Sequence, residues 1–309
     1  MNSAAADPTT RNYPVAAIRD WVETVFVAAG CSVIEAQAIA AGLVQANLYG
    51  HDSHGIGLIP QYLGNIKLGM VRCGQTIKVV ADHGALVGVD GQRGFGQTIG
   101  PQAMALAIER AGQHGVCVIG TSNTHHLARI GHWGERCAAA GFASIHFVNV
   151  QTRPLVAPWG GSDARLATNP FCVAVPHEPH PIVLDYATSA VAYGKVRVAY
   201  EGGQLMAPGL LMDAAGAPTN DPRVMVDPPW GALLPFAQHK GFALAVMCEL
   251  LGGALSGGHV QDHTPEVNPM RNNMLSVVFD PNAFCGAEEF RAEVTRMAHW
   301  VKASPPASD

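Results

Sequence analysis

Apolar residues recur every three or four positions along much of the chain, which is the spacing of helices with one buried face. Seven stretches show this spacing and are predicted to be helices: residues 15–30, 33–50, 58–69, 98–115, 129–141, 239–255 and 287–303. Pro14 suits the start of the first helix. Ser32 and Glu35 form a capping-box pattern that predicts the start of the second.

Short apolar runs bounded by turn residues predict strands between these helices. They cover residues 76–91, interpreted as two strands, and 116–123, 142–150, 171–177, 181–188 and 274–281. Helices and strands alternate without an internal repeat or a clear linker, so the predicted class is α/β. We expect one catalytic unit with four regions: a polar lead-in (1–12), a helical region (13–75), a sheet region (76–285) and a C-terminal helix (286–309) that returns to the helical region.

Composition narrows the class of protein. Of 309 residues, 48% are apolar and 14% are charged, which is typical of a well-packed globular protein. The net charge of −5 comes without basic runs and argues against nucleic acid or an anionic membrane as a partner. The apolar stretch 241–255 is interrupted by Glu249, so we expect a buried helix there. The polar N-terminus and seven scattered cysteines without a CxxC pair predict a cytoplasmic protein with reduced thiols.

Residues 87–100, VGVDGQRGFGQTIG, combine a strand, a glycine-rich turn and a helix, as a dinucleotide-binding loop does. The glycines follow the order GxxGxG rather than GxGxxG, and the next predicted strand ends without the acidic residue that would hold a ribose. We therefore expect an ordinary turn that tolerates positive φ.

The stretch GHDSHGIG, residues 50–57, is the first candidate for chemistry, and it follows a predicted helix. It allows three interpretations: a metal site completed by His125 and His126 or by His259 and His263, a structural polar turn, or an acid–base centre. An HxxH pair on a turn is a weak metal signal, and we expect no metal. Ser53 lacks a GxSxG elbow, so we do not expect it to be a nucleophile.

The acid–base interpretation rests on His54. Imidazole titrates near neutral pH, so it can give or take a proton at cellular pH. Asp185 ends an apolar predicted strand and is the candidate carboxylate to orient the ring. Lys195 and Lys240, two of five lysines, lie beside glycines in polar stretches and could offer charge to phosphate groups.

Five ordered stretches resemble the malate/L-lactate dehydrogenase family of the non-Rossmann type. They are NLYGHDSHGIGLIPQYL, NTHHLARIGHWGERCAAAGFASIHFVNV, RPLVAPWGGSDARLATNP, VLDYATSAVAYGKVRVAY and GALLPFAQHKGFALAVMCELLGGALSGG. The resemblance covers about residues 15 to 306. It implies a mostly antiparallel sheet surrounded by helices, a homodimer, NAD or NADP as cofactor, and a small 2-hydroxy or 2-oxo acid as substrate.

The resemblance also implies roles for individual residues. His54 would donate the proton, with Ser53 and Asp185 as its relay, although some ureidoglycolate dehydrogenases use the histidine that matches His126. The residues implied to line the cofactor are His54, His125, His126, Leu127, Asp185, Ala187, Thr188, Ser189, Lys195, His239 and Lys240. Thr168 and Asn169 would face the substrate.

The chain departs from the family pattern in two places. Many members carry an arginine where this chain has Leu58, so we expect Arg129 to pair with the substrate carboxylate and Leu58 to suit a bulky 2-oxo acid. Relatives also continue beyond the segment that matches residues 299–306, so we expect lower cofactor affinity here. Two alternatives stay open: an enzyme of the cyclic imine (piperideine-2-carboxylate) reductase or ureidoglycolate dehydrogenase type, and a non-catalytic truncated paralogue.

Overall fold

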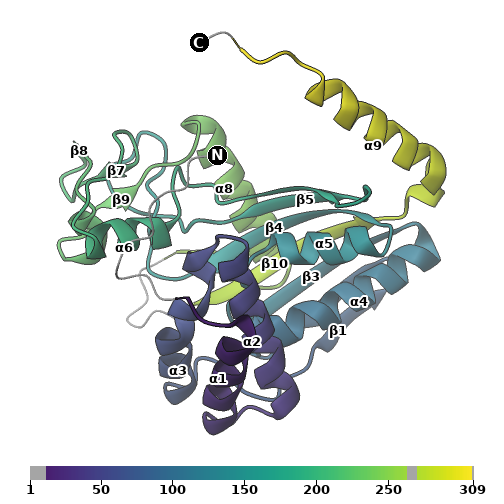
Figure 1. The fold of residues 1–309 in the computed structure, drawn as a ribbon, viewed down its shortest axis with the longest axis horizontal. Coiled ribbons are helices and arrows are strands. Elements are labelled where there is room, and N and C mark those ends of the chain that lie inside the picture. Colours follow the sequence, from purple (N-terminus) through teal and green to yellow (C-terminus); the bar gives the residue numbers. More distant parts are fainter. Residues whose placement is uncertain (1–11, 263–269, 308–309) are drawn as a thin grey trace.

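A seven-stranded sheet forms the centre of the protein (Figure 1). The computed structural model describes residues 12–262 and 270–307, so His263 lies outside the described residues. The strands lie in the order β1 (Lys78–His83), β2 (Leu86–Asp90), β3 (Val116–Thr124), β10 (Arg271–Phe279), β4 (Ala143–Gln151), β5 (Phe171–Val175) and β6 (Ile182–Tyr186). Only β2 and β3 pair in parallel, and the other neighbours are antiparallel, which confirms the predicted α/β class.

Helices cover both faces of this sheet, because alternate residues of its strands are apolar or small on each side. On one face α4 (Gly96–His114) and α5 (Gly131–Ala139) enclose a core that includes Trp133, and Gly134 of α5 lies against His146. On the other face α8 (His239–Met247) continues into a π-helical segment (Cys248–Leu255), whose Gly252 lies against Phe147 and Asn149.

The N-terminal helices α1 (Val15–Ala28), α2 (Val33–Leu48) and α3 (Ile59–Lys67) pack around a second apolar cluster. The hydroxyl of Ser32 accepts a hydrogen bond from the Glu35 amide, which confirms the predicted helix start. The Glu35 carboxylate does not return to Ser32 but accepts from the amide of Gly74 at 2.8 Å. The capping box is therefore only half formed, and Glu35 is turned toward the loop that follows α3.

A smaller layer lies beside the main sheet, around residues 193–233. It contains α6 (Tyr193–Glu201), β7 (Leu211–Met212), β8 (Pro218–Thr219), α7 (Arg223–Val226) and β9 (Ala232–Leu233). The stretch around Lys195 was expected to be a loop, and that expectation is wrong, because residues 193–201 form a helix whose Val196 and Ala199 are buried.

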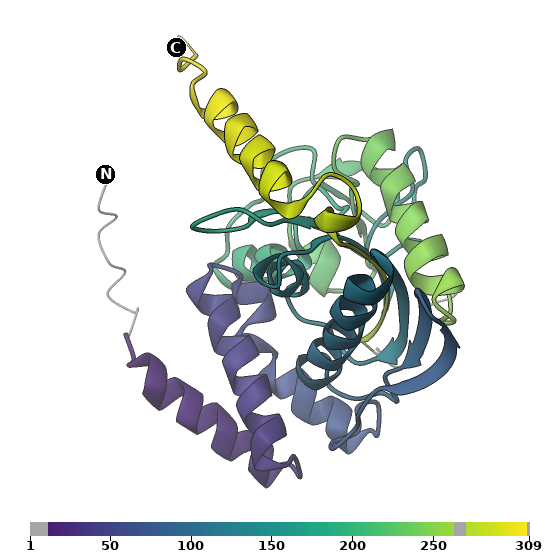
Figure 2. The same cartoon turned by 90° about the vertical axis from the view of Figure 1, so that its right-hand side faces the viewer.

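The C-terminal helix α9 (Ala287–Lys302) extends away from the rest of the protein (Figures 1 and 2). It has no buried residues, and it points away from α1, α2 and α3. The predicted return to the N-terminal region is therefore not seen in this structure. Among the described residues no helix is both long and apolar enough to cross a membrane.

The glycine-rich turn at residues 91–96 is closed by protein backbone. The turn connects β2 to α4, and α4 leads to the parallel strand β3, as in a dinucleotide-binding unit. However, the carbonyl of Gly94 accepts a hydrogen bond from the His125 amide at 2.9 Å. A Cβ at Gly96 would lie 2.2 Å from the carbonyl oxygen of His126. The positive φ angles fall on Gln92 and Arg93, so the glycines serve close packing here. The start of α4 thus supports the 125–127 segment instead of exposing amides to a phosphate.

Replacing Gly96 with alanine should destabilise the protein by about 2 kcal/mol or more, because the new methyl group meets rigid backbone. Gly64→Ala is the matched control: nothing lies within 4 Å of that position in α3, and alanine should stabilise the helix by roughly 0.5–1 kcal/mol. Urea unfolding of both variants measures the difference. Equal effects of the two substitutions would contradict the close packing of Gly96.

Candidate active site

The turn that carries residues 50–57 is fixed by Asn47, near the end of α2. Its amide nitrogen donates to Asp52 at 2.5 Å, and its amide oxygen accepts from the backbone of Ile56 at 2.9 Å. A Cβ at Gly55 would lie 2.1 Å from the same oxygen, so only glycine fits beside the histidine. One asparagine therefore sets the direction in which His54 points.

His54 and His126 form a stacked pair, with ring centroids 5.4 Å apart and an interplanar angle of 23°. His54 Nδ1 lies 2.9 Å from Ser53 Oγ, and His126 Nδ1 lies 2.7 Å from the hydroxyl of Tyr62. Each ring thus has one nitrogen anchored by a hydroxyl group. Among the described residues Nε2 of each ring is left available for a substrate.

Burial keeps both imidazoles neutral. It lowers the pKa of His54 to about 4, with smaller contributions from His51 and from the charge of Arg129. Burial also lowers the pKa of His126 well below its usual value, and the neighbouring His54 and His125 lower it further. At neutral pH the pair can accept protons and donate hydrogen bonds, but it carries no positive charge.

Five residues predicted to face the cofactor or the substrate are buried: His125, Leu127, Asn169, Thr188 and Ser189. His125 is 1% exposed, and its Nε2 pairs with Asn65. Leu127 is fully buried in the sheet core, with its amide bonded to Asn272 and its carbonyl to Trp133. The side chains of His125 and Leu127 therefore make structural contacts within the protein core next to the site.

Asn169 is also fully buried, and its amide donates to Glu249 at 2.7 Å and to the carbonyl of Ala245. It lies within the buried polar network of the π-helical segment, so its expected exposure to substrate is wrong for this structure. The carbonyl of the neighbouring Thr168 accepts from the amide and the hydroxyl of Thr188.

Asp185 belongs to β6 and faces the start of α5, where it accepts from the backbone amide of Gly131 at 2.8 Å. Its nearest cation is Arg129, with Nη1 3.9 Å away, and the described structure contains no hydrogen bond between Asp185 and His54. Burial raises the pKa of Asp185, whereas the Gly131 amide and Arg129 lower it. The predicted direct relay from Asp185 to His54 is absent, and Asp185 acts on the site through the 129–131 backbone.

Arg129 is held by several partners of its own. Its guanidinium lies 2.5 Å from Glu135 and 4.8 Å from the centre of the Tyr49 ring, in addition to its contact with Asp185. Its side chain is 10% exposed. Two carboxylates already balance this charge, so a substrate carboxylate would have to compete with them.

Leu58 was expected to shape the substrate pocket, but it packs in the N-terminal cluster. It is 9% exposed and precedes α3, so its apolar character serves the core of the helical region.

The remaining predicted cofactor residues come from two adjacent segments. The Ala190 amide donates to Leu234, and the Phe236 amide donates to Thr188, so residues 187–190 lie along 234–236. The second segment leads into α8, whose first residues His239 and Lys240 are exposed. The structure therefore brings Ala187, Thr188 and Ser189 next to the start of α8.

Lys195 lies on the other side of the His54 turn, near the start of α6. A Cβ at Gly194 would lie 2.1 Å from Cβ of Ser53, so α6 packs directly on the turn that carries His54. Lys195 itself is exposed.

Sequence reasoning missed Tyr62 and Gln97. Tyr62 is fully buried, contacts His126 through its hydroxyl and receives a hydrogen bond from Gln97 Nε2 at 3.3 Å. Its helical spacing marks it as a core residue, and nothing in the local sequence links it to a histidine 64 positions later. A buried tyrosine needs a hydrogen-bond partner, and this requirement was the only available signal.

The chain is similar to known dehydrogenases over most of its length. The family profile for malate/L-lactate dehydrogenase matches residues 13–309. The chain is 48% identical to hydroxycarboxylate dehydrogenase B of Escherichia coli K12, over 94% of this chain and 82% of that protein.

Two solved structures are similar along nearly the whole chain. Sulfolactate dehydrogenase from Methanocaldococcus jannaschii aligns with a TM-score of 0.84 and 33% identity, over 95% of this chain and 85% of that one. Delta1-piperideine-2-carboxylate reductase from Pseudomonas syringae aligns with a TM-score of 0.85 and 32% identity, over 96% and 90%.

The buried histidines should make the protein sensitive to acid. Burial lowers the pKa of His125 to about 3 and that of His146 to about 4, and the unfolded chain returns both to about 6.5. The unfolded state then binds more protons below pH ~6.5, so stability is complete above that pH and falls as the pH falls. We expect a loss of roughly 1–2 kcal/mol per histidine between pH 7 and pH 5.

Urea unfolding at several pH values measures this effect. His146→Gln should flatten the pH dependence, because it removes one of the titrating groups, whereas the exposed control His83→Gln should preserve it. A stability that stays constant from pH 7 to pH 5 would show that these histidines are not held neutral.

Proposed function

The chain belongs to the malate/L-lactate dehydrogenase family, and from this membership we infer that it is an oxidoreductase that acts on 2-hydroxy acids. It interconverts a 2-hydroxy acid and the corresponding 2-oxo acid. The stacked His54–His126 pair is the observation that supports this reaction best, since two neutral imidazoles offer the proton acceptor and the hydrogen-bond donor that a hydroxyl group needs.

His54 takes the proton in this proposal. Ser53 Oγ accepts a hydrogen bond from Nδ1 of the neutral ring, which leaves the lone pair on Nε2 free to remove the substrate hydroxyl proton. In the direction of reduction, the protonated His54 donates its proton to the carbonyl oxygen of the 2-oxo acid. The lowered pKa of His54 favours the neutral imidazole, so at neutral pH His54 is in the form that accepts the proton during oxidation of the substrate.

His126 serves as the hydrogen-bond donor. With Gln97 donating to the Tyr62 oxygen, the phenolic proton points to Nδ1 of His126, and the ring proton then sits on Nε2. Burial raises the pKa of Tyr62, so the phenol stays protonated. A ring in this tautomer stabilises negative charge on the substrate oxygen but cannot take the hydroxyl proton.

The exposed groups around His54 fit a nicotinamide dinucleotide, NAD or NADP, which supplies the hydride acceptor or donor when it is bound. Lys195 on α6 and Lys240 at the start of α8 supply positive charge, and the 187–189 backbone lies between α5 and α8. The N-terminal end of α8 adds the positive end of a helix dipole, which suits a phosphate group. These residues bind and orient the cofactor. His54 accepts the substrate proton, and His126 donates a hydrogen bond to the substrate oxygen.

Arg129 positions the site in this account. It holds Asp185 and Glu135 on either side of the 129–131 backbone, directly after the segment that carries His126. We also propose a homodimer, which the exposed apolar side chains Met297, Trp300 and Val301 on α9 support, because such side chains favour a protein partner.

Substitution of the two histidines tests their roles. His54→Ala should lower kcat by roughly 10²–10⁴-fold while cofactor binding is retained, since a positioned acid–base group is worth that much. Tyr62→Phe should cause a smaller loss, because it removes the anchor of His126 and leaves the base intact. Initial rates are compared with NADH and NADPH in turn on a 2-oxo acid and on a cyclic imine acid.

Near-normal turnover by His54→Ala together with loss of turnover by His126→Ala would reverse the two roles. Faster reduction of the cyclic imine than of every 2-oxo acid would assign the chain to the imine-reducing branch of its relatives.

The two reaction directions should differ in their pH dependence. Because burial lowers the pKa of His54 to about 4, oxidation needs a form that dominates above that value, and its kcat/KM should be flat between pH 6 and 8. Reduction needs the protonated form, so its kcat/KM should fall about tenfold per pH unit over the same range. A reduction rate that is constant below about pH 6 and falls only above pH ~6.5 would indicate a histidine with an ordinary pKa.

A further inference from the structure

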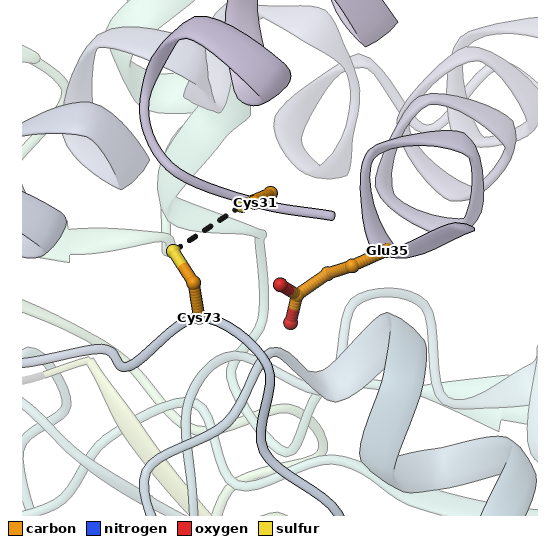
Figure 3. A group of neighbouring side chains, drawn as sticks. All are labelled: Cys31, Glu35 and Cys73. Carbon is orange, nitrogen blue, oxygen red and sulfur yellow. Dashed lines mark hydrogen bonds between the residues drawn. The ribbon is translucent and has the colours of Figure 1, made fainter. Parts of the chain in front are cut away.

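Two cysteines and a glutamate meet at a place far from the histidine pair (Figure 3). Cys31 Sγ and Cys73 Sγ are 3.3 Å apart, and a carboxylate oxygen of Glu35 lies within 4.8 Å of both sulfurs. Within residues 12–262 and 270–307 no other group of three such side chains has this spacing. Glu35 lies near one end of the 16-residue helix α2, which is about 24 Å long, and the turn that carries His54 follows its other end.

The local backbone fixes Cys31 and Glu35. After α1 the amide of Cys31 bonds to the carbonyl of Phe26 and that of Gly30 to Val27, the pattern of a helix that ends at a left-handed glycine. Cys31 is thereby turned inward, at 6% exposure. Glu35 follows in the first turn of α2, on the same side.

Cys73 comes from the loop between α3 and β1. The next residue, Gly74, has a φ of 73° and donates its amide to one Glu35 oxygen. Cys73 itself is half-buried, so the cluster is open to solvent only on this side.

Among the described residues the other Glu35 oxygen has no hydrogen bond of normal geometry, although the residue is 3% exposed and the Cys31 thiol interacts with its carboxylate. A buried carboxylate oxygen without a partner is costly, and Figure 3 shows the carboxylate directed toward the two sulfurs. Tetrahedral Zn²⁺ binds sulfur at about 2.3 Å, which separates two sulfur ligands by about 3.8 Å. The present cluster is close to that arrangement.

The geometry points to a structural Zn²⁺ site formed by Cys31, Cys73 and Glu35, with a water molecule at the fourth position on the side of Cys73. Binding releases one proton from each thiol to the solvent, and two thiolates and the carboxylate then coordinate the ion.

A disulfide between Cys31 and Cys73 would use the same sulfurs, but it explains less. Glu35 has no role in a disulfide, and its negative charge disfavours the thiolate that must form first. A cation accounts for all three side chains. The site would tie the start of α2 to the loop that enters the sheet region, so it would join the two parts of the chain.

Metal content of the purified chain tests the proposal. The protein is loaded with Zn²⁺ or Co²⁺ under reducing conditions, desalted and measured by elemental analysis and absorption. We expect one ion per chain, a thiolate-to-cobalt absorption band in the near ultraviolet, and a melting temperature that rises by several degrees.

Cys73→Ser and Glu35→Gln should each weaken binding by roughly 100-fold or more, since each removes a ligand. Cys73 is the less buried cysteine, so its serine variant is the more tolerant test of folding. Cys285→Ser removes an exposed thiol and is the matched control, which should bind Zn²⁺ as the unmodified chain does.

Three results would overturn the proposal. The first is a folded, reduced chain that binds no ion, which would leave Glu35 as an acceptor for the two thiols. The second is equal metal loss in Cys285→Ser. The third is a 31–73 disulfide that mass spectrometry finds in protein purified without reductant and that Zn²⁺ does not prevent.

Discussion

The burial of the His125–His126 segment between α3 and the start of α4 is the constraint on which the site depends. Gly96 allows the α4 backbone to touch the carbonyl of His126, and Tyr62 of α3 reaches its ring. This cover removes water from the stacked rings and keeps them neutral. In the proposed reaction, desolvation is therefore the feature that keeps His54 a proton acceptor and His126 a neutral hydrogen-bond donor.

The charged residues support this arrangement from outside. Arg129, Asp185 and Glu135 form a compact network next to the buried segment, in which one guanidinium contacts two carboxylates. This network fixes the backbone that enters α5, so the positions of His126 and of the sheet edge are coupled. The exposed lysines of α6 and α8 remain available for a bound anion.

Much of the fold could be predicted from local patterns, because helices with one apolar face and short apolar strands have distinct periods. His54 was predicted as the acid–base candidate from its glycine-bounded turn, and that role stays a prediction. The family resemblance predicted the mostly antiparallel sheet, which the structure confirms. Contacts between distant segments could not be predicted. The partner of Asp185, the burial of Leu127 and Asn169, and the link from Gln97 through Tyr62 to His126 all depend on packing that no local spacing records. The meeting of Cys31 and Cys73 is another such contact.

The protonation state of His54 is the central claim, and an NMR titration of the imidazole signals measures it directly. Signals are assigned by comparison with His54→Asn and His126→Asn. The account predicts that both rings stay neutral down to about pH 5 and that His126 carries its proton on Nε2. A His54 signal that titrates near the usual histidine pKa of about 6.5 would contradict it.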